Sequence, residues 1–104
     1  MINKKENFLQ ELYSIIDQRA KSKKINSYTK FLLKSGSKKI AKKIGEESGE
    51  LIIDYLHGSK KRIIEETADL IYHLVVLLYS KKITIKKIEE ELRKRRKLKN
   101  VRSK

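Results

Sequence analysis

The amino-acid sequence predicts an all-α protein, an antiparallel bundle of four to five helices. Proline is absent from the 104 residues and glycine occurs four times, so few residues interrupt a helix. Apolar residues recur with helical spacing along most of the chain. Glycine and serine, which end and begin helices, stand between these apolar segments. A chain of this length suits one domain with one modest core.

The helices can be placed from their apolar spacing and their capping residues. Ser27 is expected to cap a short second helix, and Gly36 to end it in the left-handed αL conformation. Ser37 is then expected to cap the third helix, which Gly58 ends, and Ser59 to cap the fourth. The predicted helices cover residues 6–20, 28–33, 38–56 and 60–80, followed by a further helix that begins at Thr84.

Composition also indicates the cellular compartment of the protein. The longest apolar run, residues 70–79, is about half the length that a bilayer requires, and the N-terminus lacks the apolar stretch of a signal peptide. Cysteine is absent, which excludes a disulfide framework and a thiolate metal site. We expect a cytoplasmic protein with no membrane partner. The chain becomes basic after Arg93 and is expected to fray there, with one domain over residues 1–96 and a tail over 97–104.

Acidic residues stand on both sides of the very short connection between the two longest helices. Glu47 and Glu50 lie before this connection, and Glu66 and Asp69 lie after it. Residues three apart point in similar directions from a helix, so each pair shares a face. Helices joined by a short loop pack antiparallel. The two pairs are therefore predicted to face each other at a similar height.

These four carboxylates are expected to bind a divalent cation. Like charges three residues apart destabilise a helix by roughly a few tenths of a kcal/mol per pair, and partial burial of two such pairs costs more. The chain carries 27 lysines and arginines, so opposite charges were readily available. All-oxygen ligation favours Mg²⁺, or Mn²⁺, over zinc. One acidic pair alone is more simply a solvated face, whereas two pairs across a hairpin are more specific.

His73 has two interpretations. It follows Asp69 by four residues and shares its side of the helix, so it is a candidate outer partner of the metal ligands. A histidine in such an apolar segment is more often a satisfied core residue. The sequence leaves both interpretations open.

Two runs, KKIGEESGE at residues 42–50 and ETADLIYHL at residues 66–74, carry the pattern EExxE followed by ExxD. SYT at residues 27–29 and the segment 83–92 extend the pattern. Together they resemble the phosphoribosyl-ATP pyrophosphatase family, within the all-α NTP pyrophosphohydrolases (MazG-like). The resemblance covers nearly the whole chain, from the first helix to about residue 96, and implies the all-α NTP pyrophosphohydrolase type of fold.

The resemblance implies hydrolysis of phosphoribosyl-ATP to phosphoribosyl-AMP and pyrophosphate, the second step of histidine biosynthesis. Water would attack the α-phosphorus, and Glu46 or Glu47 would take its proton as the catalytic base. Lys43, one turn before Glu47, would bind substrate phosphate, with an ordinary solvated lysine as the equal alternative. The resemblance also implies an ATP-like nucleotide as the bound substrate and Mg²⁺ as the cofactor, held by Glu47, Glu50, Glu66 and Asp69.

Three other functions are compatible with the sequence. A house-cleaning (d)NTP pyrophosphohydrolase of the same superfamily is separated only by the resemblance. A small basic nucleic-acid-binding helical protein would explain the formal net charge of +14, but lysine is spread along the whole chain and the acidic pairs would stay unexplained. A structural dimerisation module would also leave the acidic pairs unexplained. A homodimer is expected in addition, because the end of the predicted helix 60–80 is too apolar for one chain to cover.

Overall fold

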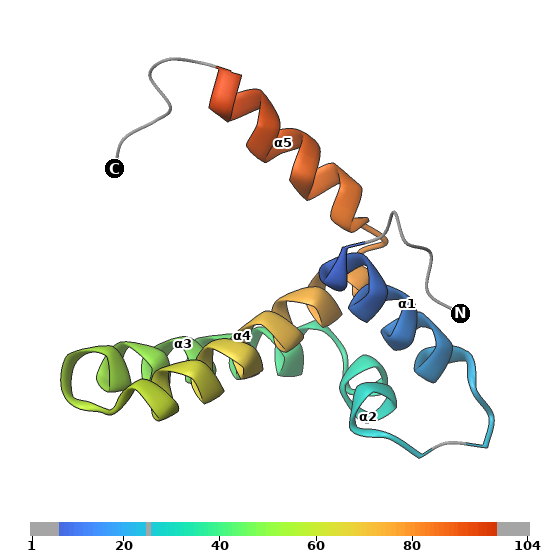
Figure 1. Ribbon diagram of the computed structural model, residues 1–104. Coiled ribbons are helices and arrows are strands. Elements are labelled where there is room, and N and C mark those ends of the chain that lie inside the picture. Colours follow the sequence, from blue (N-terminus) through green and yellow to red (C-terminus); the bar gives the residue numbers. More distant parts are fainter. Residues whose placement is uncertain (1–6, 25, 98–104) are drawn as a thin grey trace.

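Helices make up almost all of the computed structural model, which describes residues 7–24 and 26–97 (Figure 1). The helices are α1 (Phe8–Lys21), α2 (Tyr28–Ser35), α3 (Ser37–His57), α4 (Lys60–Ser80) and α5 (Ile85–Lys97). No strand occurs among the described residues. The prediction of an all-α fold with four to five helices is confirmed. In this part of the chain, no helix has the length and apolar character that crossing a membrane requires.

Serine side chains begin two helices, as the sequence predicts. The Ser27 hydroxyl accepts a hydrogen bond from the backbone N–H of Lys30 at 3.2 Å and caps α2. The Ser59 hydroxyl accepts one from the backbone N–H of Arg62 at 3.2 Å and caps α4. Each bond satisfies a donor that the first turn of a helix leaves without a partner. These caps therefore help to fix where α2 and α4 begin.

The connection between α2 and α3 is the single residue Gly36, and here two predictions are wrong. Gly36 has a φ of 94° and a ψ of −179°, so its φ is positive but its ψ lies outside the αL region. Gly36 is also the N-cap of α3, which makes Ser37 the first helical residue and not the cap. The physical reason is length, because a link of one residue has no room for a separate capping residue.

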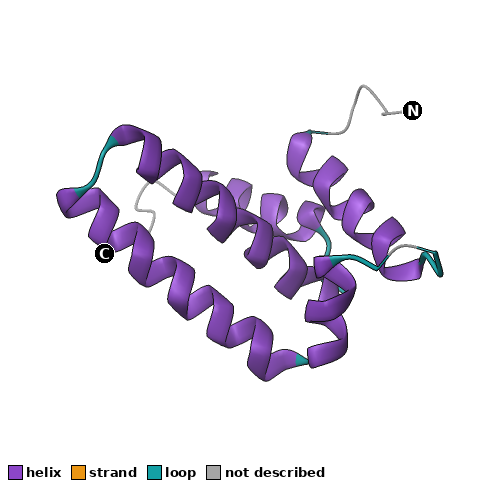
Figure 2. Cartoon of the chain, turned by 90° about the horizontal axis from the view of Figure 1, so that it is seen from below, coloured by secondary structure: helices purple, strands orange, loops and turns teal. Residues whose placement is uncertain are grey.

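α3 and α4 form one long antiparallel hairpin that extends from the rest of the chain (Figure 1, Figure 2). Only Gly58 and Ser59 separate the two helices, as the sequence predicts. α1 and α2 pack at the open end of the hairpin, and α5 leaves this end beside α1. The buried apolar core gathers at the same end and draws on every helix: Ile16, Leu32, Ile40, Val75, Val76 and Ile85.

Part of the hairpin surface is apolar and uncovered. The chain has a radius of gyration of 15.6 Å, whereas a compact domain of about 100 residues has one of about 13 Å. The apolar second half of α4 is expected to be buried centrally or at a subunit interface. His73, Val75 and Val76 are buried, but Ile71 and Leu74 remain 37% and 39% exposed. One face of this helix is therefore open within a single chain.

The C-terminal segment continues further as a helix than the sequence predicts. Fraying was expected after Arg93, but α5 runs to Lys97, so that boundary is wrong. Lysine and arginine favour helices, and positive charge alone does not end one. The rest of the predicted tail, residues 98–104, lies outside the described residues. The division into a domain over 1–96 and a tail over 97–104 stays a prediction.

Candidate functional site

Three of the four predicted metal ligands meet where α3 and α4 face each other. One carboxylate oxygen from each of Glu47, Glu66 and Asp69 lies within 4.8 Å of the other two. Glu50 is exposed and lies against Glu66, outside this group of three. The hairpin therefore brings the two acidic pairs to one place, because its short connection forces the helices to run antiparallel. Glu47, Glu66 and Asp69 are called the carboxylate group below.

Two members of the carboxylate group are buried without enough partners, whereas Asp69 is exposed. Glu47 and Glu66 are only 8% and 5% exposed. The Oε1 atoms of these two residues are buried and have no hydrogen-bond partner among the described residues. Carboxylate oxygens only accept hydrogen bonds, so neighbouring carboxylates cannot satisfy each other unless one is protonated. A donor set made of oxygen atoms alone, two of them unpartnered, fits a hard divalent cation such as Mg²⁺.

The proton affinity of Glu66 reflects this crowding. Burial, together with the neighbouring carboxyls of Glu50 and Glu47, raises the pKa of Glu66 to about 7. The positive charge of Arg62 opposes the rise in pKa. Near neutral pH, Glu66 is therefore only partly ionised. A cation held by the Glu66 oxygens would displace that proton, since metal ligation requires the ionised carboxylate.

Arg62 contacts the carboxylates on the side nearest the hairpin connection. Its guanidinium lies 2.9 Å from Glu66, 3.4 Å from Glu65 and 3.6 Å from Asp54. Neither Arg62 nor Asp54 is among the site residues predicted from the sequence. Helical spacing is the signal that could have found them. Arg62 precedes Glu66 by four residues and Asp54 follows Glu50 by four, so each shares a helix face with a predicted ligand.

Lys43 contacts the carboxylates on the opposite side. Its ammonium nitrogen lies 3.5 Å from Glu46 and 3.6 Å from Glu47, about one turn further along α3. The phenol of Tyr28, followed by these two carboxylates, raises the pKa of Lys43, so this lysine stays protonated. Glu46 is exposed and lies outside the carboxylate group. The predicted phosphate-binding lysine and both predicted base residues therefore lie together.

His73 is buried next to Asp69 and bonds to its backbone. The Nδ1 atom of His73 lies 2.7 Å from the backbone carbonyl oxygen of Asp69. Because a carbonyl oxygen only accepts hydrogen bonds, Nδ1 carries the proton. The Nε2 atom of the same ring is hydrogen-bonded to the hydroxyl of Tyr28, which is 3.0 Å away. These bonds hold the Tyr28 side chain against α4, and the role of His73 as an outer partner of metal ligands stays a prediction.

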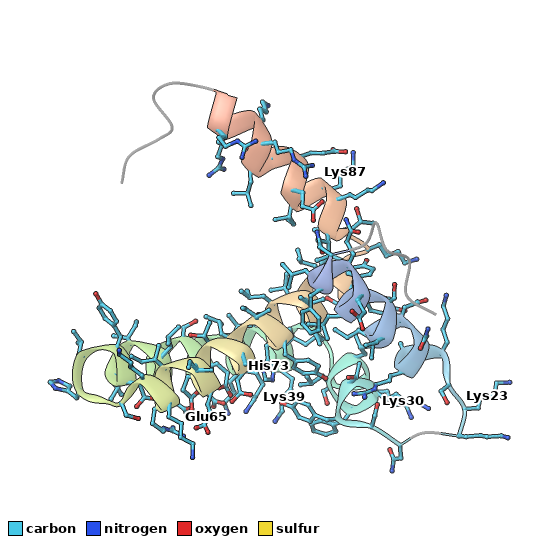
Figure 3. The ribbon with its side chains drawn as sticks, viewed as in Figure 1. Lys23, Lys30, Lys39, Glu65, His73 and Lys87 are labelled. Carbon is cyan, nitrogen blue, oxygen red and sulfur yellow. The ribbon has the colours of Figure 1, made fainter. Side chains whose placement is uncertain are left out.

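Basic side chains lie on both sides of the carboxylate group along the hairpin. From the connection towards the open end, Arg62 comes first, the carboxylate group second and Lys43 third, at steps of about one helical turn, or 5.4 Å. Lys39 lies one further turn along, beside α2. In Figure 3, Glu65 marks the side nearest the connection and Lys39 marks the side nearest α2. Cationic side chains on both sides of the carboxylate group suit a polyphosphate chain.

Comparisons with known proteins point to the same chemistry. The family model described as phosphoribosyl-ATP pyrophosphohydrolase matches residues 9–96. A phosphoribosyl-ATP pyrophosphatase from Clostridium novyi is 44% identical over 89 residues, which is 86% of this chain and 81% of that protein. A protein of the same name from Sulfolobus acidocaldarius is 46% identical over 92 residues, which is 88% of this chain and 97% of that protein.

A longer relative matches as well. The histidine biosynthesis bifunctional protein HisIE of Staphylococcus epidermidis is 45% identical over 92 residues, and the match spans 44% of its length. The region matched by the family model contains the carboxylate group, Lys43 and Arg62. The resemblance that the sequence motifs indicate is therefore confirmed. The chain belongs to the phosphoribosyl-ATP pyrophosphohydrolase family.

Proposed function

We propose that the protein hydrolyses phosphoribosyl-ATP to phosphoribosyl-AMP and pyrophosphate, the second step of histidine biosynthesis. Family membership supports this reaction, as do relatives named phosphoribosyl-ATP pyrophosphatase that match over most of their length. The observation that carries the proposal is the carboxylate group, in which two buried oxygens lack a partner within the described part of the chain. We assign the activity to the cytoplasm, where nucleotides are available.

The cofactor is assigned as Mg²⁺, with Mn²⁺ as the alternative. The residues that would hold it are Glu47, Glu50, Glu66 and Asp69. When bound, the ion would supply positive charge to the phosphate oxygens and to the departing pyrophosphate. Glu50 adds a fourth carboxylate because it lies against Glu66 at the edge of the carboxylate group. Incomplete ligation by protein suits Mg²⁺, which usually keeps several waters and shares substrate oxygens.

Water attacks the α-phosphorus, and one carboxylate takes its proton. Glu46 and Glu47 are the two candidates for this base, and both lie within 3.6 Å of the Lys43 ammonium. Glu47 belongs to the carboxylate group, so its oxygens are needed for the cation. Glu46 is exposed beside the group and is the first choice of base. Lys43 would exchange a carboxylate partner for a substrate phosphate when the nucleotide binds.

A homodimer is proposed as the assembly. A Cβ added at Gly45 or Gly49 would meet nothing within 4 Å, apart from the helix's own backbone, so α3 is open to close approach. Packing a second hairpin against this surface would remove apolar side chains from water. The exposed apolar residues of the hairpin include Ile52, Leu56, Ile64, Ile71 and Leu74.

The test of the reaction is an assay of the purified protein with phosphoribosyl-ATP and Mg²⁺. We expect release of pyrophosphate and phosphoribosyl-AMP, loss of turnover in EDTA and recovery with excess Mg²⁺. Release of pyrophosphate from dNTPs but not from phosphoribosyl-ATP would instead indicate a house-cleaning (d)NTP pyrophosphohydrolase. Turnover that persists in EDTA would contradict the cofactor assignment and leave the substrate assignment standing.

A further inference from the structure

Helix α2 presents two aromatic rings to solvent. Tyr28 and Phe31 stack with their ring centroids 6.2 Å apart and an angle of 25° between the ring planes. Tyr28 is 46% exposed and Phe31 is 51% exposed. These two residues are called the α2 ring pair. Two neighbouring, half-exposed aromatic rings offer apolar surface on which another ring can pack.

Tyr28 of the α2 ring pair packs against α4. Tyr28 stacks on Tyr72 of α4, with centroids 6.1 Å apart, and meets the ring of His73 edge-on at 5.7 Å. The Tyr28 hydroxyl also bonds to His73 Nε2 at 3.0 Å. The Tyr72 hydroxyl is bonded in turn to Thr29 of α2. These contacts hold the Tyr28 ring against α4, and the Phe31 ring packs on Tyr28.

The α2 ring pair adjoins the carboxylate group on the side away from the hairpin connection. Lys43 lies one turn before Glu47 on α3, and His73 lies one turn after Asp69 on α4. Because α3 and α4 are antiparallel, Lys43 and His73 lie at a similar level, about 5.4 Å beyond the carboxylates. Tyr28 contacts His73 at this level. Burial raises the pKa of the Tyr28 hydroxyl, and the nearby charge of Lys43 opposes that rise.

A second lysine connects the two surfaces. The ammonium nitrogen of Lys39 lies 5.7 Å from the centroid of the Phe31 ring, in a cation–π arrangement. Lys39 and Lys43 are one turn apart on α3, so they form a short basic track from the α2 ring pair to the carboxylate group. Figure 3 shows Lys39 and His73 in the same region of the molecule, between α4 and α2.

We propose that the purine base of the substrate stacks on the α2 ring pair, and that Lys39 and Lys43 bind the α-phosphate. The inference rests on the proposed function, because it supplies that reaction with a base subsite. Stacking uses the flat face of a base and the exposed rings, and the basic track leads from the base to the scissile phosphate. The pyrophosphate end of the nucleotide then points towards Arg62.

The first experiment separates binding from chemistry. Phe31→Leu keeps an apolar side chain but removes the ring, and Phe8→Leu is the matched control, since Phe8 is 66% exposed on α1. We expect Phe31→Leu to raise the KM for phosphoribosyl-ATP by about 5- to 100-fold, the effect of losing one base–ring stack, with kcat within about twofold of the parent. Phe8→Leu is expected to leave both constants unchanged. An unchanged KM in Phe31→Leu would overturn the base subsite.

The second experiment does not depend on turnover. Equilibrium binding of AMP is compared with binding of ribose 5-phosphate, which lacks the base, by titration calorimetry on the parent and on Phe31→Leu. We expect the substitution to weaken AMP binding by about 5- to 100-fold, as for KM, and to leave ribose 5-phosphate binding unchanged. Equal affinity for AMP in both proteins would overturn the proposal even if the enzyme hydrolyses phosphoribosyl-ATP.

The two experiments also separate the failure of this inference from that of the proposed reaction. A parent protein that binds AMP through Phe31 but does not hydrolyse phosphoribosyl-ATP would contradict the reaction and leave the base subsite standing. Sedimentation of both proteins gives a further outcome. A Phe31→Leu chain with altered subunit number and unaltered AMP affinity would assign the α2 ring pair to a subunit interface instead.

Discussion

Two acidic side chains, Asp17 beside α4 and Glu66 on α4, lie in different electrostatic surroundings. At the open end of the hairpin, Asp17 of α1 accepts a hydrogen bond from the Tyr79 hydroxyl at 2.7 Å and lies 3.2 Å from the Lys21 ammonium. The Tyr79 hydrogen bond lowers the pKa of Asp17. Nearer the hairpin connection, burial raises the pKa of Glu66 to about 7. Asp17 is paired with Tyr79 and Lys21, whereas Glu66 meets Arg62 at 2.9 Å but keeps one buried oxygen without a partner among the described residues.

The partners of Asp17 show that this fold can pair a carboxylate fully with side chains of its own. The chain has 27 lysines and arginines, yet Glu47 and Glu66 each keep a buried oxygen without a partner among the described residues. Shortage of positive charge therefore does not explain the carboxylate group. Its unpartnered oxygens are best explained as ligand positions, whereas the Asp17–Tyr79 pair is a structural bond between α1 and α4.

The largest expected effect is on turnover. Glu47→Gln and Asp69→Asn each remove one charge from the carboxylate group with little change of shape. We expect each to reduce turnover of phosphoribosyl-ATP by about 100-fold or more, because charge stabilisation at the reacting phosphate is lost. Helical circular dichroism should be unchanged. Asp17→Asn is the matched control and should retain turnover, and normal turnover in both site variants would contradict the metal assignment.

The next effect is on stability with and without metal. Mg²⁺ at about 100 times its dissociation constant should stabilise the parent by about 2.7 kcal/mol, which raises Tm by roughly 10 °C in a domain of this size. Glu66→Gln should abolish that gain and should raise the Tm of the metal-free protein, because it removes a buried, repelled charge. Scanning calorimetry with EDTA and with Mg²⁺ measures both changes. A metal-free Glu66→Gln that melts below the parent would show that the Glu66 charge stabilises the fold.

A smaller effect is expected in the dependence of stability on pH. The pKa of Glu66 is raised from 4.5 to about 7 on folding, so the folded state binds its proton more tightly. The stability that this contributes is fully present below pH 4.5 and is lost as the pH rises to about 7. The difference in Tm between metal-free parent and Glu66→Gln should therefore widen over this range. A constant difference would contradict the raised pKa.

The smallest effect is expected at the open end. Tyr79→Phe removes the hydrogen bond to Asp17 and should lower stability by about 1 kcal/mol, with turnover unchanged. Because the pKa of Asp17 is lowered on folding, its contribution is present above its usual value of 3.8 and is lost as the pH falls further. Thermal unfolding at neutral and acidic pH tests this. Tyr55→Phe, at an exposed tyrosine of α3, is the control.

Local features of the fold follow from the sequence more readily than long-range ones. The caps at Ser27 and Ser59 involve residues three apart, and the meeting of Glu47 with Glu66 follows from a connection of two residues. Each depends only on helix geometry and chain length. The motif residues therefore indicate both the family and the place of the carboxylate group.

Features that depend on how helices pack against each other could not be predicted. The Tyr28–His73 bond joins residues 45 positions apart, and it exists only because α2 crosses α4 at one particular place. The ion pairs of Arg62 likewise depend on which rotamer reaches across the hairpin to Asp54. Spacing in the sequence shows which residues share a helix face, but not which face of another helix they meet.

The one-residue link at Gly36 has a consequence for the proposed nucleotide-binding surface. α2 carries the ring pair and α3 carries Lys43 and Glu47, and only Gly36 separates the two helices. Its φ of 94° is a backbone angle that residues other than glycine rarely adopt. The conformation of this one residue therefore helps to set the distance between the aromatic surface and the carboxylates, and with it the length of nucleotide that the proposed site accepts.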